Sequence, residues 1–185
     1  AVLSATALRL FASRDQARAR LTELAEGRRF ALVLSESLDW PPAPGRGIAW
    51  QWLPDATVLL ADGERLALIE PQRVTSSHSQ DLLRGCGAVE GIPASGIVGP
   101  GGSENALRFI AHAQVASAAA LVGAMAGALE LSVAYASERE QFGRKIGSFQ
   151  AVRHFCADML VDLESSRSAL YGAAWAVDHL DAKQG

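Results

Sequence analysis

The stretch that decides the fold is "SEREQFGRKIGSFQAVRHFCADM", residues 137–159. A long pattern of apolar residues at helical spacing leads into it from Ser103, and a second such pattern begins at Ser148. Gly143 suits the C-terminal exit from the first helix, and Ser148 suits the N-terminal cap of the next. The stretch therefore predicts a hairpin of two long helices joined by a short basic turn.

Each predicted helix has one largely apolar face, and two such faces cannot cover each other completely. A helical bundle normally needs a third or fourth partner, so we expect further helices from a longer chain, from other subunits, or from both. A helix over 103–140 would be roughly 57 Å long. The faces consist of Leu107, Ile110, Ala111, Gln114, Ala118, Leu121, Met125, Leu129 and Val133, and of Val152, Phe155, Cys156, Met159, Leu163, Leu170, Ala174 and Val177.

The most apolar segment of the chain is Val115–Leu129, which Gln114 and Glu130 bound. A membrane-spanning helix needs about 20 apolar residues, and this segment is shorter. We therefore expect a buried bundle helix and no membrane partner.

Upstream of these helices the pattern changes twice. Residues 1–27 have helical periodicity, with Gly27 as a C-terminal stop. Residues 28–102 contain short apolar runs separated by Pro, Gly and Asp-Gly signals, which predict a small antiparallel sheet or barrel with Asp62-Gly63 as a hairpin turn. Residues 81–97 are less regular. The four clearest runs are 29–36, 47–52, 56–61 and 64–70.

Composition excludes several function classes. The 185 residues are 49% hydrophobic and 20% charged, which is typical of a soluble globular protein. A net charge of -3 gives no global support for nucleic-acid binding. The two cysteines, Cys86 and Cys156, lack metal-ligand spacing and suit a reducing cytoplasm. We expect no signal peptide, no metal site and a cytoplasmic location.

The turn between the helices is rich in groups that bind nucleotides. Arginines form forked contacts with phosphates, amides donate to and accept from ribose or purine, and an aromatic ring offers a flat apolar face. An ADP-like moiety fits this set. From the residues alone, a solvated basic loop with a hydrophobic plug is the favoured alternative. The residues concerned are Arg139, Gln141, Phe142, Arg144, Lys145, Gln150, Arg153 and His154.

The longer stretch "AYASEREQFGRKIGSFQAVRHFCADML" resembles the central signature of the acyl-CoA dehydrogenases. In that family Arg-x-x-Phe-Gly ends one helix, and a Phe-Gln or His-Gln begins the next, eleven residues after the Arg. Arg139, Phe142, Gly143 and Gln150 match at that spacing. The resemblance covers most of the chain, strongly from 103 to 182 and weakly before.

The resemblance implies an α+β fold with a small antiparallel β middle domain followed by a long-helix C-terminal bundle. Residues 1–27 would be the end of an N-terminal helical domain, 28–102 the middle domain, and 103–185 the first two bundle helices. The family's Pro-x-x-Gly-Ser-Asp and Trp-x-Thr elements are not legible; Trp50 and Trp52 are expected to be buried structural residues.

The same resemblance implies FAD as cofactor, with its adenosine-pyrophosphate half reaching the turn of a neighbouring subunit. Carried over by position, Arg139 would pair with the pyrophosphate. Gln141 and Phe142 would line the adenosine end, and Gln150 would hydrogen-bond there. Ser35 stands where a family Thr or Ser touches the flavin.

The implied reaction is α,β-dehydrogenation of an acyl-CoA thioester, in which a glutamate removes the α-proton and the β-hydrogen leaves as hydride to the flavin. An electron-transferring flavoprotein would accept the electrons. The catalytic residue is unknown, because one family position for the base is Ala113 and the other lies beyond residue 185. Gln114 stands where many members have an arginine for CoA.

These departures leave three alternatives open. The chain belongs to a catalytic subunit of a homo-oligomer or hetero-oligomer, or to a non-catalytic FAD-retaining partner such as those of bacterial enzymes acting on steroid side chains. The third alternative is an unrelated helical interaction module. The acyl chain, whether fatty acid or steroid side chain, cannot be read from the sequence.

Overall fold

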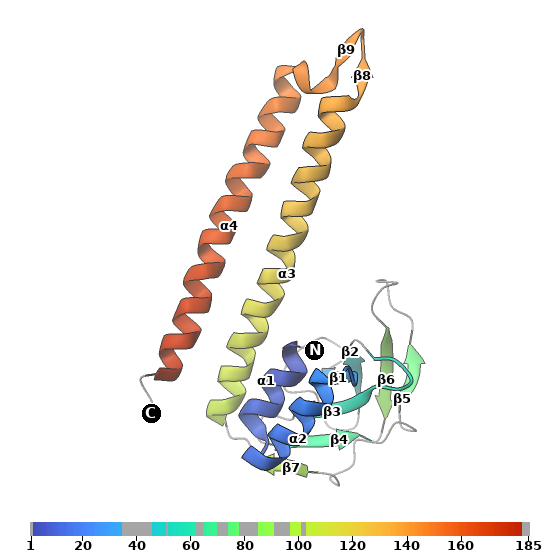
Figure 1. The fold of residues 1–185 in the computed structure, drawn as a ribbon, viewed down its shortest axis with the longest axis vertical. Helices are drawn as coiled ribbons and strands as arrows, with labels where there is room; N and C mark the ends of the chain where they lie inside the picture. Colours follow the sequence, from blue (N-terminus) through green and yellow to red (C-terminus); the bar gives the residue numbers. More distant parts are fainter. Residues whose placement is uncertain are drawn as a thin grey trace. The chain divides into compact units, whose positions relative to one another are not determined.

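The computed structural model describes residues 2–34, 46–50, 52–61, 65–69, 74–77, 85–90, 97–100 and 103–182. The chain divides into two compact units, Ala1–Ala113 and Gln114–Gly185. Figure 1 shows the first as a sheet with short helices and the second as a long helical hairpin. The first unit includes the start of the first long helix together with the sheet. The division into three domains, 1–27, 28–102 and 103–185, stays a prediction.

The helical zone expected over residues 1–27 consists of two helices, α1 (Val2–Phe11) and α2 (Arg14–Ala25). The break falls at Ser13, whose backbone N–H and hydroxyl both donate to Gln16 Oε1, at 3.4 and 2.8 Å. This is the glutamine half of a capping box. The signal was present in the sequence as Ser-x-x-Gln, and the periodicity alone did not reveal it.

The predicted stop at Gly27 is confirmed. Gly27 has a φ of +94°, and its N–H donates to Leu24 O at 3.2 Å. The N–H of Arg28 donates to Glu23 O at 2.9 Å, which completes a Schellman motif.

A seven-stranded sheet forms most of the first unit, in the order β5-β6-β2-β1-β3-β4-β7. All the neighbouring pairs are antiparallel except β1 and β3, which are parallel. The α+β class is confirmed. The prediction of a purely antiparallel sheet is wrong, because β2 and β3 lie on opposite sides of β1, and β3 runs in the same direction as β1. The strands are β1 (Phe30–Leu34), β2 (Arg46–Trp50), β3 (Thr57–Ala61), β4 (Arg65–Ile69), β5 (Val74–Ser77), β6 (Cys86–Glu90) and β7 (Ile97–Pro100).

The four predicted apolar runs all appear as strands. β3 pairs with β4 through Val58 opposite Ile69 and Ala61 opposite Leu66, as the hairpin interpretation required. The Asp62-Gly63 turn itself lies outside the described residues. Within residues 81–97, where the less regular pattern predicted no strand, β6 is present and pairs along its length with β2.

Side chains alternate between two cores, one on each face of the sheet. Phe30, Leu32 and Leu59 pack with Leu8 and Phe11 of α1 on one face. The opposite face carries a second cluster of Ala31, Val33, Ala49, Trp52, Ala56, Val58, Leu60, Val74 and Val89. Trp52, only 8% exposed, is buried as expected, whereas Trp50, also expected to be buried, is half-buried.

The start of α3 (Ser103–Glu138) completes the helix-side core. The Phe109 ring meets the Phe11 ring edge-on at 6.1 Å, and Phe109 is buried. Asn105 Nδ2 donates to Leu10 O at 2.8 Å, which satisfies a carbonyl at the C-terminal end of α1. Ala113, where some family members have the base, packs against this cluster.

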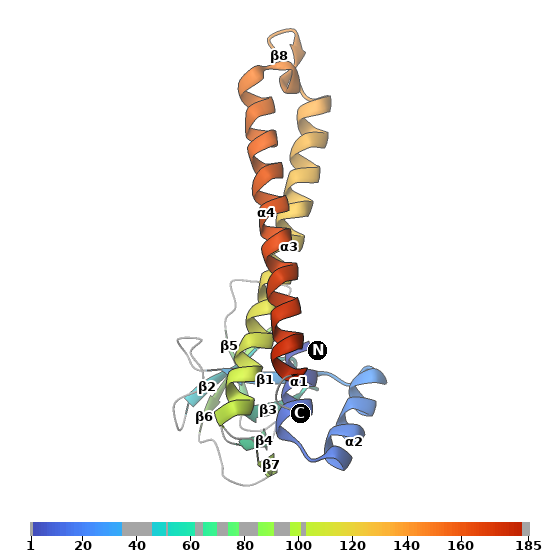
Figure 2. The ribbon, with the colours of Figure 1, turned by 90° about the vertical axis from the view of Figure 1, so that its left-hand side faces the viewer.

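α3 and α4 (Gln150–Ala182) run side by side in opposite directions, as Figures 1 and 2 both show. Along each helix, one row of buried and half-buried residues recurs at steps of three or four, so the members of the row share one face. They are Val115, Ala118, Val122, Met125, Leu129, Ser132 and Ala136 on α3, and Val152, Cys156, Met159, Leu163, Ser166, Leu170, Ala174 and Val177 on α4.

Large apolar side chains remain exposed on both helices, which confirms that the pair does not cover its own apolar surface. Phe155 was expected on the covered face and is 71% exposed. Leu121 and Val133, expected on the α3 face, are exposed as well. Others of this kind are Leu131, Tyr135, Leu160, Val161, Tyr171 and Trp175.

Within the described part of the chain, Leu107–Glu138 is long and apolar enough to cross a membrane, by length and composition alone. The length argument made for Val115–Leu129 is therefore wrong, because the helix continues far beyond that segment on both sides. Its role as a buried bundle helix stays a prediction.

Candidate functional site

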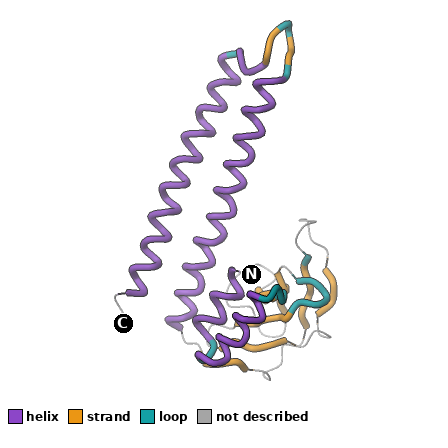
Figure 3. The backbone as a smooth tube through the Cα atoms, viewed as in Figure 1, coloured by secondary structure: helices purple, strands orange, loops and turns teal. Residues whose placement is uncertain are grey.

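The connection between α3 and α4 is a compact structure of its own, seen in Figure 3 as two short strands at the tip of the helical hairpin. α3 ends at Glu138, two residues before the predicted end of 140. The N–H of Arg139 donates to Tyr135 O at 2.9 Å, and Arg139 O accepts from the N–H of Ile146 at 2.8 Å. The backbone of Arg139 is thus fixed on both sides, while its side chain is exposed.

A two-residue turn forms the tip. β8 (Glu140–Gln141) pairs with β9 (Arg144–Lys145), so that Phe142 and Gly143 connect them. Both have positive φ, 54° and 73°, as a type I′ turn requires. Gly143 therefore belongs to this turn and does not end the helix, which corrects its predicted role.

Phe142 is unusual on two counts. It is 93% exposed, and it adopts the left-handed conformation that residues other than Gly, Asn and Asp rarely adopt. Its ring meets the Phe149 ring edge-on, with centroids 6.3 Å apart. A large aromatic side chain held in this way presents a free flat face to a ligand or to another chain.

Phe149 makes several of the contacts that stabilise the turn. The guanidinium carbon of Arg144 lies 4.0 Å from the Phe149 ring centroid, a cation–π distance. Phe149 N–H donates to Ile146 O at 3.1 Å, and Phe149 O accepts from Arg153 N–H at 3.2 Å. Arg144 is thus engaged within the hairpin, whereas Arg139 is not.

A short 3-10 helix, η2 (Ile146–Ser148), returns the chain to α4. A Cβ added at Gly147 would lie 2.8 Å from Ala136 O, so the turn approaches the end of α3 as closely as glycine permits. The Ser148 hydroxyl donates to Lys145 O at 2.7 Å. The predicted cap at Ser148 is therefore wrong by one residue, because α4 begins at Gln150 and Phe149 occupies the N-cap position.

The two predicted amides make local contacts and are exposed. Gln141 Nε2 donates to Glu140 O at 2.8 Å, and Gln150 Nε2 lies 3.3 Å from His154 Nε2. Gln150 opens α4, whose first backbone N–H groups favour an anion.

Charge at the hairpin is positive and unpaired. Within the described residues, no carboxylate lies within ion-pairing distance of Arg139, Arg144, Lys145 or Arg153. Guanidinium groups without a carboxylate partner, on the same hairpin as an exposed ring and a helix N-terminus, have the chemistry of a nucleotide phosphate subsite.

The structure brings four of the five predicted cofactor residues onto one hairpin: Arg139, Gln141, Phe142 and Gln150. The fifth, Ser35, lies outside the described residues. Sequence reasoning missed the part that Phe149 plays, although Phe-x-x-x-x-x-x-Phe spacing across the turn was visible. It also missed the left-handed turn, for which Gly143 was the available signal.

Comparison with known proteins agrees with this geometry. Residues 101–185 match the family described as "Acyl-CoA dehydrogenase, C-terminal domain". Probable acyl-CoA dehydrogenase YngJ of Bacillus subtilis is 34% identical over 133 residues, covering 64% of this chain and 35% of YngJ. Acyl-CoA dehydrogenase IpdE2 of Mycolicibacterium smegmatis is 35% identical over 114 residues, covering 62% of this chain and 35% of IpdE2.

Among solved structures, the ChsE4-ChsE5 complex from Mycobacterium tuberculosis superposes with a TM-score of 0.77 at 26% identity. The match covers 96% of this chain and 55% of the matched chain. The present chain thus spans about a third of these curated relatives and about half of the solved one.

Two features define the class of protein. One is a small mixed sheet, and the other is the long helical hairpin that follows it, whose tip carries basic and aromatic side chains. Over residues 101–185 the chain belongs to the acyl-CoA dehydrogenase family, by its match to that family's C-terminal domain.

Proposed function

We propose that this chain is part of a subunit of an FAD-dependent acyl-CoA dehydrogenase, which catalyses α,β-dehydrogenation of an acyl-CoA thioester. We further propose that the α3–α4 hairpin receives the adenosine-pyrophosphate half of an FAD bound mainly by a neighbouring subunit. The observation that carries the proposal is that the hairpin holds both an exposed Arg139 side chain, which has no carboxylate partner among the described residues, and an exposed Phe142 ring, within a segment that matches the family.

The residues present fit this half of the cofactor. A pyrophosphate needs cations that are not already neutralised, and Arg139 has no carboxylate partner among the described residues. An adenine needs a flat apolar surface, and Phe142 offers one. Gln141 and Gln150 supply exposed amides close to both in sequence.

When bound, FAD supplies the acceptor for the hydrogen that leaves the substrate. This chain's own contribution is to bind and to orient. Backbone hydrogen bonds on both sides of Arg139 fix the position of its Cα, so only side-chain rotamer freedom is lost when the guanidinium pairs with a phosphate. Ser35 would contact the flavin end.

A second candidate function is a non-catalytic, FAD-retaining partner in a hetero-oligomer. It is favoured by Ala113, which carries no carboxylate, and by Gln114 in place of the family's arginine. Family membership sets aside the third alternative, an unrelated helical module.

We also propose an oligomer formed through the helical bundle, an electron-transferring flavoprotein as electron acceptor and a cytoplasmic location. Exposed apolar side chains on α3 and α4 support the oligomer. The matched ChsE4-ChsE5 structure is a complex, which supports an assembly of two kinds of subunit. The acyl group, fatty acid or steroid side chain, stays open.

Visible absorption of the purified full-length protein tests FAD binding. We expect flavin bands in the protein alone or after coexpression with its partner subunit. A protein that stays colourless in both cases, and does not bind added FAD, would sink the proposal and its non-catalytic alternative together.

Substrate bleaching separates the two candidate functions. Anaerobic addition of short-chain, long-chain and steroid acyl-CoA thioesters should bleach the flavin if the subunit is catalytic. Flavin that is retained but never bleached, while a coexpressed partner restores bleaching, would assign the non-catalytic function.

A further inference from the structure

A second concentration of positive charge lies far from the hairpin in sequence, on α1 and α2. Residues 1–29 contain six arginines and three carboxylates, although the whole chain has a net charge of -3. The carboxylates are Asp15, Glu23 and Glu26. This part of the chain is therefore positive within a negative protein, which is the electrostatic mark of a surface for an anionic partner.

The six arginines divide into two sets of three. Arg20 and Arg28 pair with Glu23, and Arg29 pairs with Asp55. The other set consists of Arg9, Arg14 and Arg18, which have no carboxylate within ion-pairing distance among the described residues.

The unpaired set lines one groove between α1 and α2, with a volume of about 950 Å³. Arg14, Arg18, Leu21 and Ala25 recur at steps of four and three, so they share one face of α2. Arg9 comes from α1. The floor is apolar, and the remaining lining residues are Ala12, Ala17, Thr22 and Glu26.

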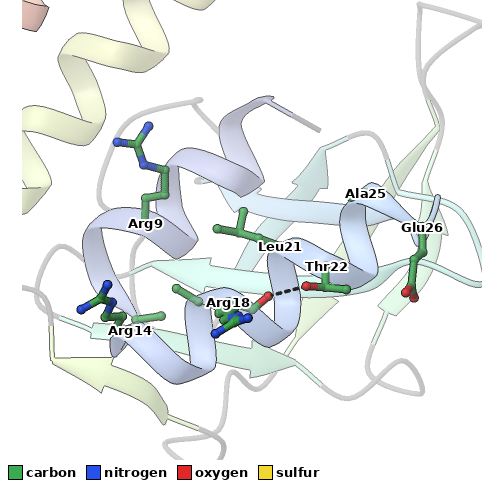
Figure 4. A pocket seen from close by; sticks show the side chains of 9 residues that line it. Arg9, Arg14, Arg18, Leu21, Thr22, Ala25 and Glu26 are labelled. Carbon is green, nitrogen blue, oxygen red and sulfur yellow. Dashed lines mark hydrogen bonds between the residues drawn. The ribbon is translucent and has the colours of Figure 1, made fainter.

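Figure 4 shows the guanidinium groups of Arg9, Arg14 and Arg18 apart from one another around the groove, with Leu21 between the helices and Glu26 at the far end. All three arginines are exposed. Small-ligand pockets enclose roughly 70–90% of their ligand and converge their polar groups on it. Separated, exposed cations along an apolar floor instead match a ligand with several spaced carboxylates.

We propose that the groove between α1 and α2, the arginine groove, is a docking site for an acidic amphipathic segment of a partner protein. Arg9, Arg14 and Arg18 pair with its carboxylates, and the surface of Leu21 and Ala17 receives an apolar side chain. This inference does not depend on the α3–α4 hairpin, which lies on a different unit of the chain.

The test uses full-length protein and a fluorescein-labelled helical peptide with glutamates four residues apart beside leucines. The control peptide has glutamines in place of the glutamates. Fluorescence anisotropy should show binding of the glutamate peptide only, and raising NaCl from about 50 to about 300 mM should weaken it several-fold, because the pairs are exposed to solvent.

The chain offers a matched pair of variants. Arg9→Gln/Arg14→Gln/Arg18→Gln should weaken binding of the peptide at least about tenfold. Arg20→Gln/Arg28→Gln/Arg29→Gln removes the same charge outside the groove and should change it less than about twofold. Circular dichroism checks both folds; if the groove variant loses helicity, the three single substitutions replace it, each expected to weaken binding measurably.

Three results would overturn the proposal. They are no binding of the glutamate peptide, equal losses in the two triple variants, and equal binding of the glutamine peptide. Tighter binding of inorganic phosphate or ADP than of the peptide, lost in the groove variant, would also overturn it, because the groove would then be a small-anion site.

Discussion

Arg139 and Arg144 lie five residues apart on one hairpin and have different environments. The Arg144 guanidinium is 4.0 Å from the Phe149 ring centroid, so it stabilises the turn. Arg139 makes its hydrogen bonds through the backbone alone, which leaves the guanidinium available. At the residue scale, one of two arginines on the same hairpin thus stabilises the turn, and the other keeps a guanidinium that is available to a ligand.

Replacing Arg139 by Ala should weaken FAD retention about 10-fold to 100-fold, since it removes charge-assisted hydrogen bonds to the pyrophosphate. The backbone hydrogen bonds survive in alanine, so the hairpin should stay folded. FAD affinity by fluorescence titration and oligomer size by light scattering measure the effect, and both should fall because the proposed contact would cross a subunit boundary.

Lys145→Ala is the control, because it removes one charge from the same hairpin. It should change FAD affinity less than about threefold, as expected for a screened surface charge. Equal effects of the two substitutions would mean that the hairpin contributes only general positive potential, and the assignment of Arg139 would then be wrong.

At the scale of the element, Gly27 and Gly172 occupy opposite kinds of position: glycine is favoured at the first and disfavoured at the second. Gly27 ends α2 with φ of +94° in open space, so its role is conformational and not steric. Gly172 lies within α4, and a Cβ added there meets nothing within 4 Å. A helix interior favours alanine over glycine, whereas a left-handed cap favours glycine.

Gly27→Ala should therefore lower the free energy of unfolding by about 1 kcal/mol, and Gly172→Ala should raise it by up to about 1 kcal/mol. Urea denaturation followed by circular dichroism measures both. The same sign for the two substitutions would contradict the cap geometry of α2, or would show that another chain packs against Gly172.

At the scale of the whole molecule, α3 and α4 carry large apolar side chains that the described part of the chain does not cover. Leu131 and Tyr135 are 73% and 60% exposed on a helix whose only charged residue between Gln114 and Ser137 is Glu130. Exposed apolar surface of this extent marks an interface. Its burial in an oligomer would also explain why α3 is apolar enough to resemble a membrane span.

Leu131→Gln/Tyr135→Gln should shift the oligomer to smaller species, because burying each large apolar side chain contributes about 1.5–3 kcal/mol. Light scattering coupled to size exclusion, over a range of concentrations, measures the shift. Leu53→Gln, a polar replacement at another exposed apolar residue, should leave the size unchanged. An unaltered oligomer in the double variant would place the interface elsewhere.

Periodicity in the sequence was enough to predict the two long helices, four of the strands, the Gly27 stop and the shortage of bundle partners, because these depend on local patterning and on which faces are apolar. The residues of the hairpin were predicted as a group for the same reason, since a short turn keeps Arg139, Gln141, Phe142 and Gln150 close whatever its conformation. Their role toward FAD stays a prediction.

Tertiary structure alone decided the parallel pairing of β1 with β3, which depends on how the chain crosses the sheet. It also decided that Arg144 is held by Phe149 while Arg139 is free, and that Arg9, Arg14 and Arg18 share one groove. Distances between side chains on different elements are not encoded in local spacing. The sequence by itself determined which chemistry is present at the helical hairpin, and the fold determined which of its cations are free to act.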